Sequence, residues 1–203
     1  MKFQKKVVKI KNFYNKNYDK YQNSIKSIGW SSKKDQYLRF SKLLQNIDIN
    51  NKSILDVGCG FGDLIFFIKK YNEKKKFIYT GVDISDKILS YSKTVHKKKN
   101  IKFICGDFYS LKLIKHDIVL SSGSMSLNLH LKSKNLENMI EKMMIASNYC
   151  VVMNFLSSYS DYQLKKNQHF SPEKLFKISK KFSKKVNIIH DYNLYEFTVQ
   201  IFK

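Results

Sequence analysis

The sequence predicts an α/β fold: a doubly wound, mostly parallel seven-stranded sheet with a C-terminal antiparallel strand and N-terminal helices. Short β-branched runs alternate with helical periods from Ser53 onward, and a cluster of three glycines joins the first run to a helix. Strands that alternate with helices form βαβ units and a parallel sheet. At 203 residues the chain suits one well-filled core. We therefore expect a single domain over 1–203, with a helical N-terminal cover over 1–50 and the sheet-bearing core over 51–203.

Each element of the core is expected from its own pattern. Strand-like runs fall at 53–57, 76–82, 101–105, 116–121 and 149–156, and helical periods at 63–71, 85–95 and 135–147. The last of these helices carries one apolar stripe at helical spacing, which we expect to pack on the sheet. The stripe consists of Leu136, Met139, Ile140, Met143 and Met144.

The C-terminal region is expected to add one helix and two strands. Ser171 and Pro172 open the helix as its N-cap and its first residue. The runs 184–190 and 195–202 are strand-like, and only four residues separate them. So short a connection allows only an antiparallel pair.

Two helical stretches are expected before the first strand, and the second of them spans 32–47. The first carries a stripe of aromatic and apolar residues that lie three or four apart. This stripe consists of Tyr14, Tyr18, Tyr21, Ile25 and Ile28. It fits either a helix packed on the domain, which is the commoner arrangement, or a lid over a ligand.

The formal charge of +22 suggests nucleic acid as a partner. Nearly all of the positive charge is lysine, however, and Arg39 is the only arginine. Guanidinium is the group that binds phosphate and base edges in bidentate fashion. We therefore favour a solvated basic surface over an RNA-binding face, which stays as the alternative.

Cysteine usage and hydropathy favour a cytoplasmic protein. Cys59, Cys105 and Cys150 are odd in number and none stands in a CxxC or Cys/His spacing, so we expect reduced thiols and no metal site. No apolar run approaches the roughly 18 residues that a membrane span requires. The N-terminal stretch also lacks an apolar segment of signal-peptide length.

The glycine cluster in ILDVGCGFGDL is the strongest functional signal. It follows the first strand, where a doubly wound sheet binds its ligand. Gly58 and Gly60 let a ligand approach the backbone without a Cβ in the way. Asp83, 21 residues after Gly62, ends the second strand, where a carboxylate accepts ribose hydroxyls. A nucleoside-containing cofactor is implied, and NAD is disfavoured because Asp63 at the helix start would repel a pyrophosphate.

With these two motifs the chain resembles the class I S-adenosylmethionine-dependent methyltransferases over about residues 30–203. The resemblance implies a Rossmann-like fold and S-adenosyl-L-methionine as cofactor. It implies that Asp56 orients the glycine loop, that Asp107 accepts the adenine amino group, and that Phe108 and Ile84 enclose the adenine ring. The full set of cofactor-binding residues that it implies is Gln36, Arg39, Asp56, Gly58, Cys59, Gly60, Asp83, Ile84, Asp107, Phe108 and Ser121.

Two of these residues lie ahead of the glycine motif. The run GWSSKKDQYLRF resembles a subgroup of small bacterial methyltransferases, which places Gln36 and Arg39 to hold the cofactor carboxylate. For Arg39 the alternative is an exposed charge on a helix.

Residues that follow the strand ends are expected to position the methyl acceptor, because these positions face the substrate. The catalytic candidates are Ser122 after the fourth strand, Asn154 after the fifth and His190 after the sixth. His190 is the best candidate for a general base, since imidazole titrates near neutral pH and Asp191 or Tyr192 could orient it. A hydrogen-bonded turn residue is the alternative for His190.

Missing motifs narrow the substrate. The segment SSGSMSLN lacks the [DNS]PP[YFW] signature of many nucleic-acid amino-methyltransferases, and no Pro-Cys pair exists for 5-methylcytosine chemistry. The sequence therefore predicts methyl transfer to an O or N atom of a small molecule or glycan unit. An RNA methyltransferase that docks through its basic surface is the alternative, and a cofactor-binding or assembly protein without catalysis is the third hypothesis.

Overall fold

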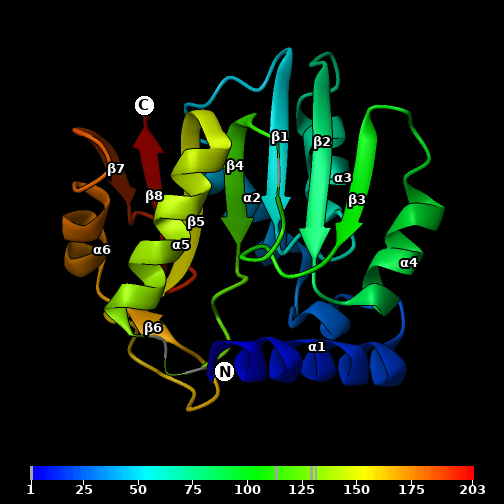
Figure 1. Cartoon of the computed structure of the whole chain (residues 1–203), viewed down its shortest axis with the longest axis horizontal. Coiled ribbons are helices and arrows are strands. Elements are labelled where there is room, and N and C mark those ends of the chain that lie inside the picture. Colours follow the sequence, from blue (N-terminus) through cyan, green and yellow to red (C-terminus); the bar gives the residue numbers. More distant parts are fainter. Residues whose placement is uncertain (1, 113, 129, 131) are drawn as a thin grey trace.

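A computed structural model describes residues 2–112, 114–128, 130 and 132–203. Its centre is a sheet with the strand order β3-β2-β1-β4-β5-β8-β7 (Figure 1). The strands on this path are β1 (Lys52–Val57), β2 (Phe77–Asp83), β3 (Ile101–Cys105), β4 (His116–Ser122), β5 (Ser147–Ser157), β7 (Lys185–Ile189) and β8 (Glu196–Phe202). The first five are parallel, while β8 lies antiparallel to both β5 and β7. The predicted fold class is therefore confirmed.

One short strand was not expected. β6 (His169–Phe170) pairs in parallel with the carboxyl end of β5, opposite Leu156 and Ser157. This pairing holds the end of the long segment that follows β5 against the sheet.

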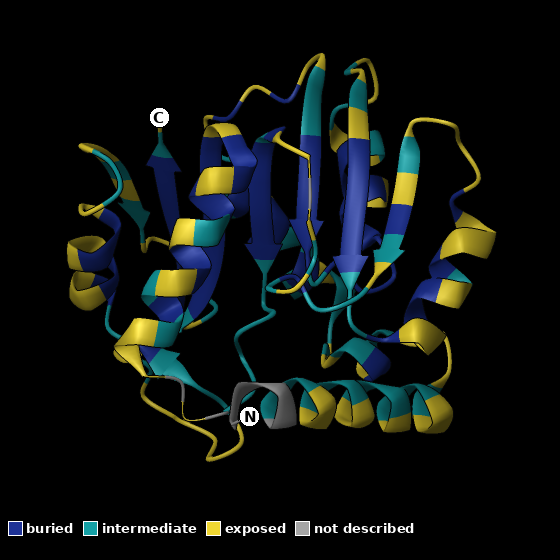
Figure 2. Ribbon diagram, in the orientation of Figure 1, coloured by how far each residue is buried: buried dark blue, intermediate teal, exposed yellow. Residues whose placement is uncertain are grey.

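Helices cover both faces of the sheet, each over its own apolar core. On one face, α2 (Lys33–Leu43), α3 (Asp63–Tyr71) and α4 (Asp86–Val95) contribute Leu43, Ile65 and Leu89 to the core. On the other face, α5 (Ser133–Ala146) and α6 (Pro172–Ser179) cover the second core. The five apolar residues expected on α5 all belong to that core, which confirms the predicted stripe. Figure 2 shows the central strands buried between these two layers.

Local chemistry explains where several helices begin. The side chain of Ser171 accepts the amide of Lys174 and Pro172 occupies the first turn of α6, as the sequence predicts. The side chain of Ser85 caps α4 in the same way by accepting the amide of Ile88. The left-handed backbone of Gly62, with φ of 74°, turns the chain from β1 into α3.

The N-terminal stripe is divided between two elements rather than carried by one helix. α1 (Lys2–Tyr21) ends before Gln22, which has a positive φ of 49°, and Ser24 then caps the short 3-10 helix η1 (Ile25–Ile28). α2 likewise stops at Leu43, short of the predicted end at 47, and Asn46 has a φ of 60°. Residues in left-handed backbone follow both helices where hydrophobic spacing alone would continue them, and of the two Asn46 is the type that adopts this conformation readily.

Helix α1 runs across the carboxyl ends of the central strands (Figure 1). None of its described side chains is fully buried (Figure 2). Polar contacts with the start of α4 hold it: Asn15 donates to Asp86 at 2.9 Å, and Lys87 pairs with Asp19 at 2.5 Å. None of the described helices combines the length and hydrophobicity needed to cross a bilayer.

Candidate active site

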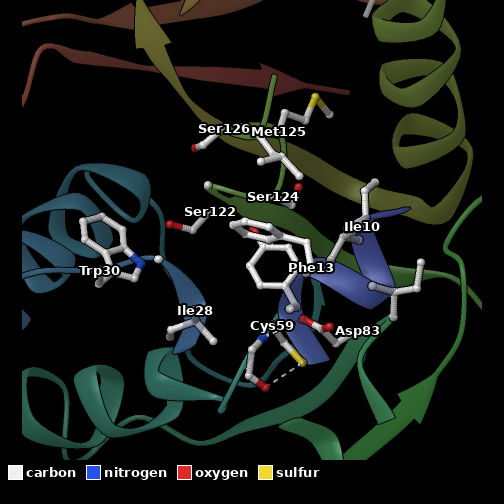
Figure 3. Close-up of a pocket in the computed structure, with 18 of the residues that line it drawn as sticks. Ile10, Phe13, Ile28, Trp30, Cys59, Asp83, Ser122, Ser124, Met125 and Ser126 are labelled. Atoms are coloured by element: carbon white, nitrogen blue, oxygen red, sulfur yellow. Dashed lines mark hydrogen bonds between the residues drawn. The ribbon is translucent and has the colours of Figure 1, made fainter. Parts of the chain in front are cut away.

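A cavity of about 660 Å³ lies between α1 and the carboxyl ends of the strands. This edge includes the topological switch point, because β1 neighbours both β2 and β4 and successive strands are added on opposite sides of it. The volume falls within the range of about 300–1,000 Å³ that small-molecule sites occupy. Figure 3 shows Ile10 and Phe13 of α1 opposite the segment from Ser122 to Ser126, with Asp83 below them. The predicted ligand edge is thus a covered cavity.

The glycine turn after β1 forms the floor of this cavity. Gly58 and Gly60 have φ values of 77° and 54°, a region that residues with a side chain rarely adopt. A Cβ on Gly58 would stand 2.6 Å from the Cβ of Ser124, so the loops after β1 and β4 can meet only through glycine. The backbone amide of Gly60 donates to Asp83 at 2.9 Å, which ties the turn to the end of β2.

Asp83 is fixed by backbone donors on both sides. One carboxylate oxygen accepts the amide of Gly60 and the other accepts the amide of Ser85, each at 2.9 Å. Burial raises the pKa of this carboxyl, while these hydrogen bonds act in the opposite direction. Partial burial and the nearby Asp83 carboxylate together raise the pKa of Tyr14, which also lines the cavity, to about 12. Asp83 is therefore a rigid acceptor that opens onto the cavity.

The loop after β3 borders the same part of the cavity. Asp107 accepts the amide of Tyr109 at 3.1 Å and the hydroxyl of Ser110 at 2.9 Å. Phe108 is buried in the core and Ile84 is half-buried, and both line the cavity. Cys59 lines it as well. A flat apolar group can lie here with a carboxylate at its edge.

Asp56 lies deeper, beneath the glycine turn. It is 4% exposed and accepts the hydroxyl of Tyr79 at 2.6 Å. Burial raises the pKa of Asp56 to about 7 against the lowering effect of that hydrogen bond, and the carboxylates of Asp83 and Asp63 add to the rise. The carboxyl of Asp56 consequently titrates near neutral pH.

Gln36 and Arg39 both reach the cavity from α2, but each is partly engaged within the protein. The amide nitrogen of Gln36 donates to Asp63 at 2.9 Å, which leaves its buried oxygen Oε1 without a partner among the described residues. The Nε of Arg39 donates to Glu196 at 2.6 Å, and its Nη2 donates to the other oxygen of the same carboxylate. The guanidinium also lies over the ring of Trp30, 4.0 Å from its centroid.

Three of the predicted site residues are not among the described residues that line the cavity: Ser121, Asn154 and His190. The hydroxyl of Ser121 is buried and donates to the carbonyl of Val57 at 2.9 Å. Asn154 stays inside the sheet because β5 continues to Ser157, and its side chain donates to Thr198 at 2.7 Å.

His190 is the third of these residues, and it is exposed at the far edge of the sheet. It follows β7, which is three strands from β4. At about 4.8 Å per strand, the end of β7 lies about 14 Å from β4. It is one strand from β8, whose Glu196 lines the cavity. Its neighbour Asp191 pairs with Lys42 at 2.8 Å instead of orienting the imidazole.

Other residues reach the cavity without having been predicted. Tyr14 and Phe13 come from α1, Trp30 from the turn before α2, and Glu196 from the start of β8. The spacing of Tyr14 on the N-terminal stripe was the one available signal, and its interpretation as a lid agrees with the position of α1. Nothing in the local sequence of Glu196 indicates a cavity residue, because its place depends on β8 pairing with β5.

Comparisons with known proteins agree with this geometry. Residues 48–193 match the family model described as a methyltransferase domain. Rv1506c of Mycobacterium tuberculosis, whose name places it among the methyltransferases, is 31% identical over 161 residues, which cover 74% of this chain and 93% of that protein. Ribosomal RNA small subunit methyltransferase A of Mesomycoplasma hyopneumoniae is 34% identical over 88 residues, but these cover only 43% of this chain and 32% of that enzyme.

A solved structure covers the chain almost completely. Magnesium protoporphyrin IX methyltransferase from Synechocystis PCC 6803, with bound S-adenosylhomocysteine, aligns with a TM-score of 0.68 and 13% identity over 97% of this chain and 99% of that one. The glycine turn, the acidic end of β2 and the covered edge are all present in the chain described above. The family model and these relatives show that the chain belongs to the class I S-adenosylmethionine-dependent methyltransferases.

Proposed function

We propose that the chain transfers the methyl group of S-adenosylmethionine to an O or N atom of a small molecule or glycan unit. The observation that carries this proposal is the covered cavity, in which the glycine turn shares one enclosed space with the segment after β4. Two backbone hydrogen bonds of 2.8 Å, from Asn128 to the carbonyl of Lys166 and from Gln168 to that of Ser126, close this side of the cavity. A small molecule can be enclosed there.

The residues fit the cofactor as follows. Asp83, with both oxygens already oriented, is proposed to accept the ribose hydroxyls. Ile84 and Phe108 are proposed to enclose the adenine, with Asp107 at its amino group. The unpartnered Oε1 of Gln36 is an acceptor, because its nitrogen is committed to Asp63. It therefore suits the ammonium of the cofactor, which refines the prediction that Gln36 holds the carboxylate.

Arg39 is proposed to remain the partner of the cofactor carboxylate through Nη1, the nitrogen that Glu196 leaves available. A Cβ on Gly123 would stand 2.3 Å from this nitrogen, so the glycine makes room for it. The bound cofactor supplies an activated methyl group. The chain aligns the acceptor and excludes water, and Ser122, whose buried hydroxyl has no partner among the described residues, can donate to the acceptor.

The substrate class is tested with methyl-labelled S-adenosylmethionine, the full-length protein and a cell extract. Counts are separated into RNA, protein, glycan or lipid, and small-molecule fractions. Label in small molecules or glycans is the expected result. Label in RNA that ribonuclease removes, and that high salt suppresses, would instead support the RNA alternative suggested by the charge of +22 and by the partial match to an RNA methyltransferase.

Binding of S-adenosylmethionine is expected to strengthen with pH. Because the pKa of Asp56 is about 7, its carboxyl is mostly protonated at lower pH, whereas the cationic ligand favours the ionised form. We expect the affinity to rise about fivefold to tenfold between about pH 6 and about pH 8, with release of a proton on binding. Calorimetry in two buffers of different ionisation enthalpy measures both quantities.

Asp56→Asn is the matched variant for this experiment, and it should bind with little dependence on pH. Proton uptake on binding, or an equal pH dependence in the variant, would show that another group is responsible.

A further inference from the structure

The cavity extends past the proposed cofactor residues, and apolar side chains from three segments line this extension together with polar ones such as Ser126 and Asn167. We call it the acceptor end: the part that lies over β4, β5 and β8 rather than over β1 to β3. It is lined by Val7, Ile10, Met125, Leu127, Leu156 and Leu164. Figure 3 shows Ile10 and Met125 on this side of the cavity. Such side chains bind an apolar body, because burial removes its methylene groups from water.

Among the residues that the structure describes, the acceptor end offers no side chain suited to removing a proton at neutral pH. Its charged side chains among the described residues are Lys6, Lys166 and Glu196, and no histidine stands among the described residues that line the cavity. Tyr14 and Tyr109 also line the cavity, but burial raises the pKa of both hydroxyls. Both oxygens of Glu196 accept hydrogen bonds from Arg39, and this pair is buried. A hydroxyl or ammonium group that accepts the methyl group would have to lose its proton without a general base from the described residues of the acceptor end.

The charges of this region favour an anion. The carboxylate of Glu196 at the acceptor end is paired with Arg39. Lys6, which donates to the carbonyl of His130, and Lys166 come from the two segments that border the acceptor end. The whole chain carries a formal charge of +22, which attracts anionic ligands over a long range. The unpartnered hydroxyl of Ser122 adds a hydrogen-bond donor at the junction with the glycine turn.

We propose that the methyl acceptor is an apolar molecule that carries a carboxylate, and that a carboxylate oxygen is methylated to give a methyl ester. This inference rests on the proposed small-molecule function and narrows it. The carboxylate oxygen supplies the electron pair of the new O–CH₃ bond, and the C–S bond breaks with its pair passing to sulfur. No proton has to be removed from a carboxylate before it is methylated. This agrees with the finding that the described residues of the acceptor end include no side chain suited as a general base.

Calorimetric titration of the protein saturated with S-adenosylhomocysteine tests this inference with four probes. Octanoate combines chain and charge, octanol has the chain alone, acetate has the charge alone, and octylamine reverses the charge. We expect octanoate to bind at least tenfold more tightly than each of the other three. Equal or tighter binding of octanol or octylamine, or no binding of octanoate, would overturn the inference.

A matched pair of variants locates the binding. Leu156→Asp places a like charge at the acceptor end, and Ile114→Asp places it at an 80% exposed site outside the cavity. We expect the first variant to lose octanoate affinity at least tenfold and to keep its affinity for S-adenosylhomocysteine, and the second to change neither. If Leu156→Asp also loses S-adenosylhomocysteine, the half-exposed Leu164→Asp takes its place in the comparison.

Equal octanoate binding in the acceptor-end variant and Ile114→Asp would overturn the inference. That result would leave the small-molecule function standing. Label in RNA from the extract experiment would overturn the function itself, so the two failures are distinguishable.

Discussion

Asp83→Asn is expected to weaken S-adenosylmethionine binding at least about a hundredfold, since each tenfold corresponds to about 1.4 kcal/mol. The carboxylate accepts two backbone amides and, in the proposed complex, the ribose hydroxyls as well. Hydrogen bonds to a charged group contribute about 1.5–3 kcal/mol each. An amide cannot replace them, because its nitrogen would meet a backbone N–H as a second donor. The variant therefore loses ligand contacts and also loosens the glycine turn at Gly60.

Isothermal calorimetry at fixed salt and pH measures this effect, and thermal unfolding shows whether the variant is folded. Asp48→Asn is the matched control, because Asp48 is an exposed carboxylate ahead of β1 that pairs with Lys75 and lies outside the cavity. We expect its affinity to equal that of the parent protein. An Asp83→Asn affinity within threefold of the parent would exclude the proposed ribose contact.

The parts of the site that follow from local sequence were predictable. The glycine turn, Asp83, Asp107 and Phe108 each lie within a few residues of a strand end, and the parallel strands bring these ends together. A strand, a tight turn and a helix leave their signatures in neighbouring residues. Hydrophobic period and glycine position therefore determine both the fold and the cofactor edge.

Two of the three catalytic candidates, Asn154 and His190, could not be placed by the same reasoning. His190 follows a strand as Ser122 does, and the rule that strand ends face the substrate does not distinguish them. Their positions differ because β8 inserts between β5 and β7 and moves His190 to the outer edge. Asn154 does not reach the cavity because β5 continues for three residues after it, which keeps Asn154 within the sheet. Strand order and strand length are tertiary properties, and element boundaries are the least reliable feature of a single sequence.

The cover of the cavity was foreseen only as an alternative. The tyrosine spacing fits both a packed helix, the commoner arrangement, and a lid, because both present one apolar stripe to the domain. The structure separates the two possibilities by burial: no described side chain of α1 is fully buried, and Tyr14 faces the cavity instead of a core. The break at Gln22 then lets η1 turn toward the glycine turn. The side chain of Ile28 packs there, 3.2 Å from where a Cβ on Gly60 would stand.

Arg39→Met is expected to lower the free energy of unfolding by about 3–5 kcal/mol, because it leaves the Glu196 carboxylate buried without a partner. The two side chains are 157 residues apart in sequence and join α2 to the start of β8. Lys42→Met is the matched control on the same helix: its ammonium pairs with Asp191, which is 61% exposed, so the loss should be below about 1 kcal/mol.

Urea unfolding measures both losses, and the double variant Arg39→Met/Glu196→Leu identifies their cause. If the cost comes from the unpaired carboxylate, replacing it with an apolar side chain of similar volume should restore more than half of the lost stability. A double variant as unstable as Arg39→Met would instead assign the cost to the guanidinium stacked on Trp30. The same double variant should still bind S-adenosylmethionine weakly, because restoring the stability of β8 does not restore Nη1 beside Gly123. The double variant would then show that Arg39 contributes to stability through Glu196 and to ligand affinity through Nη1, as two separate effects.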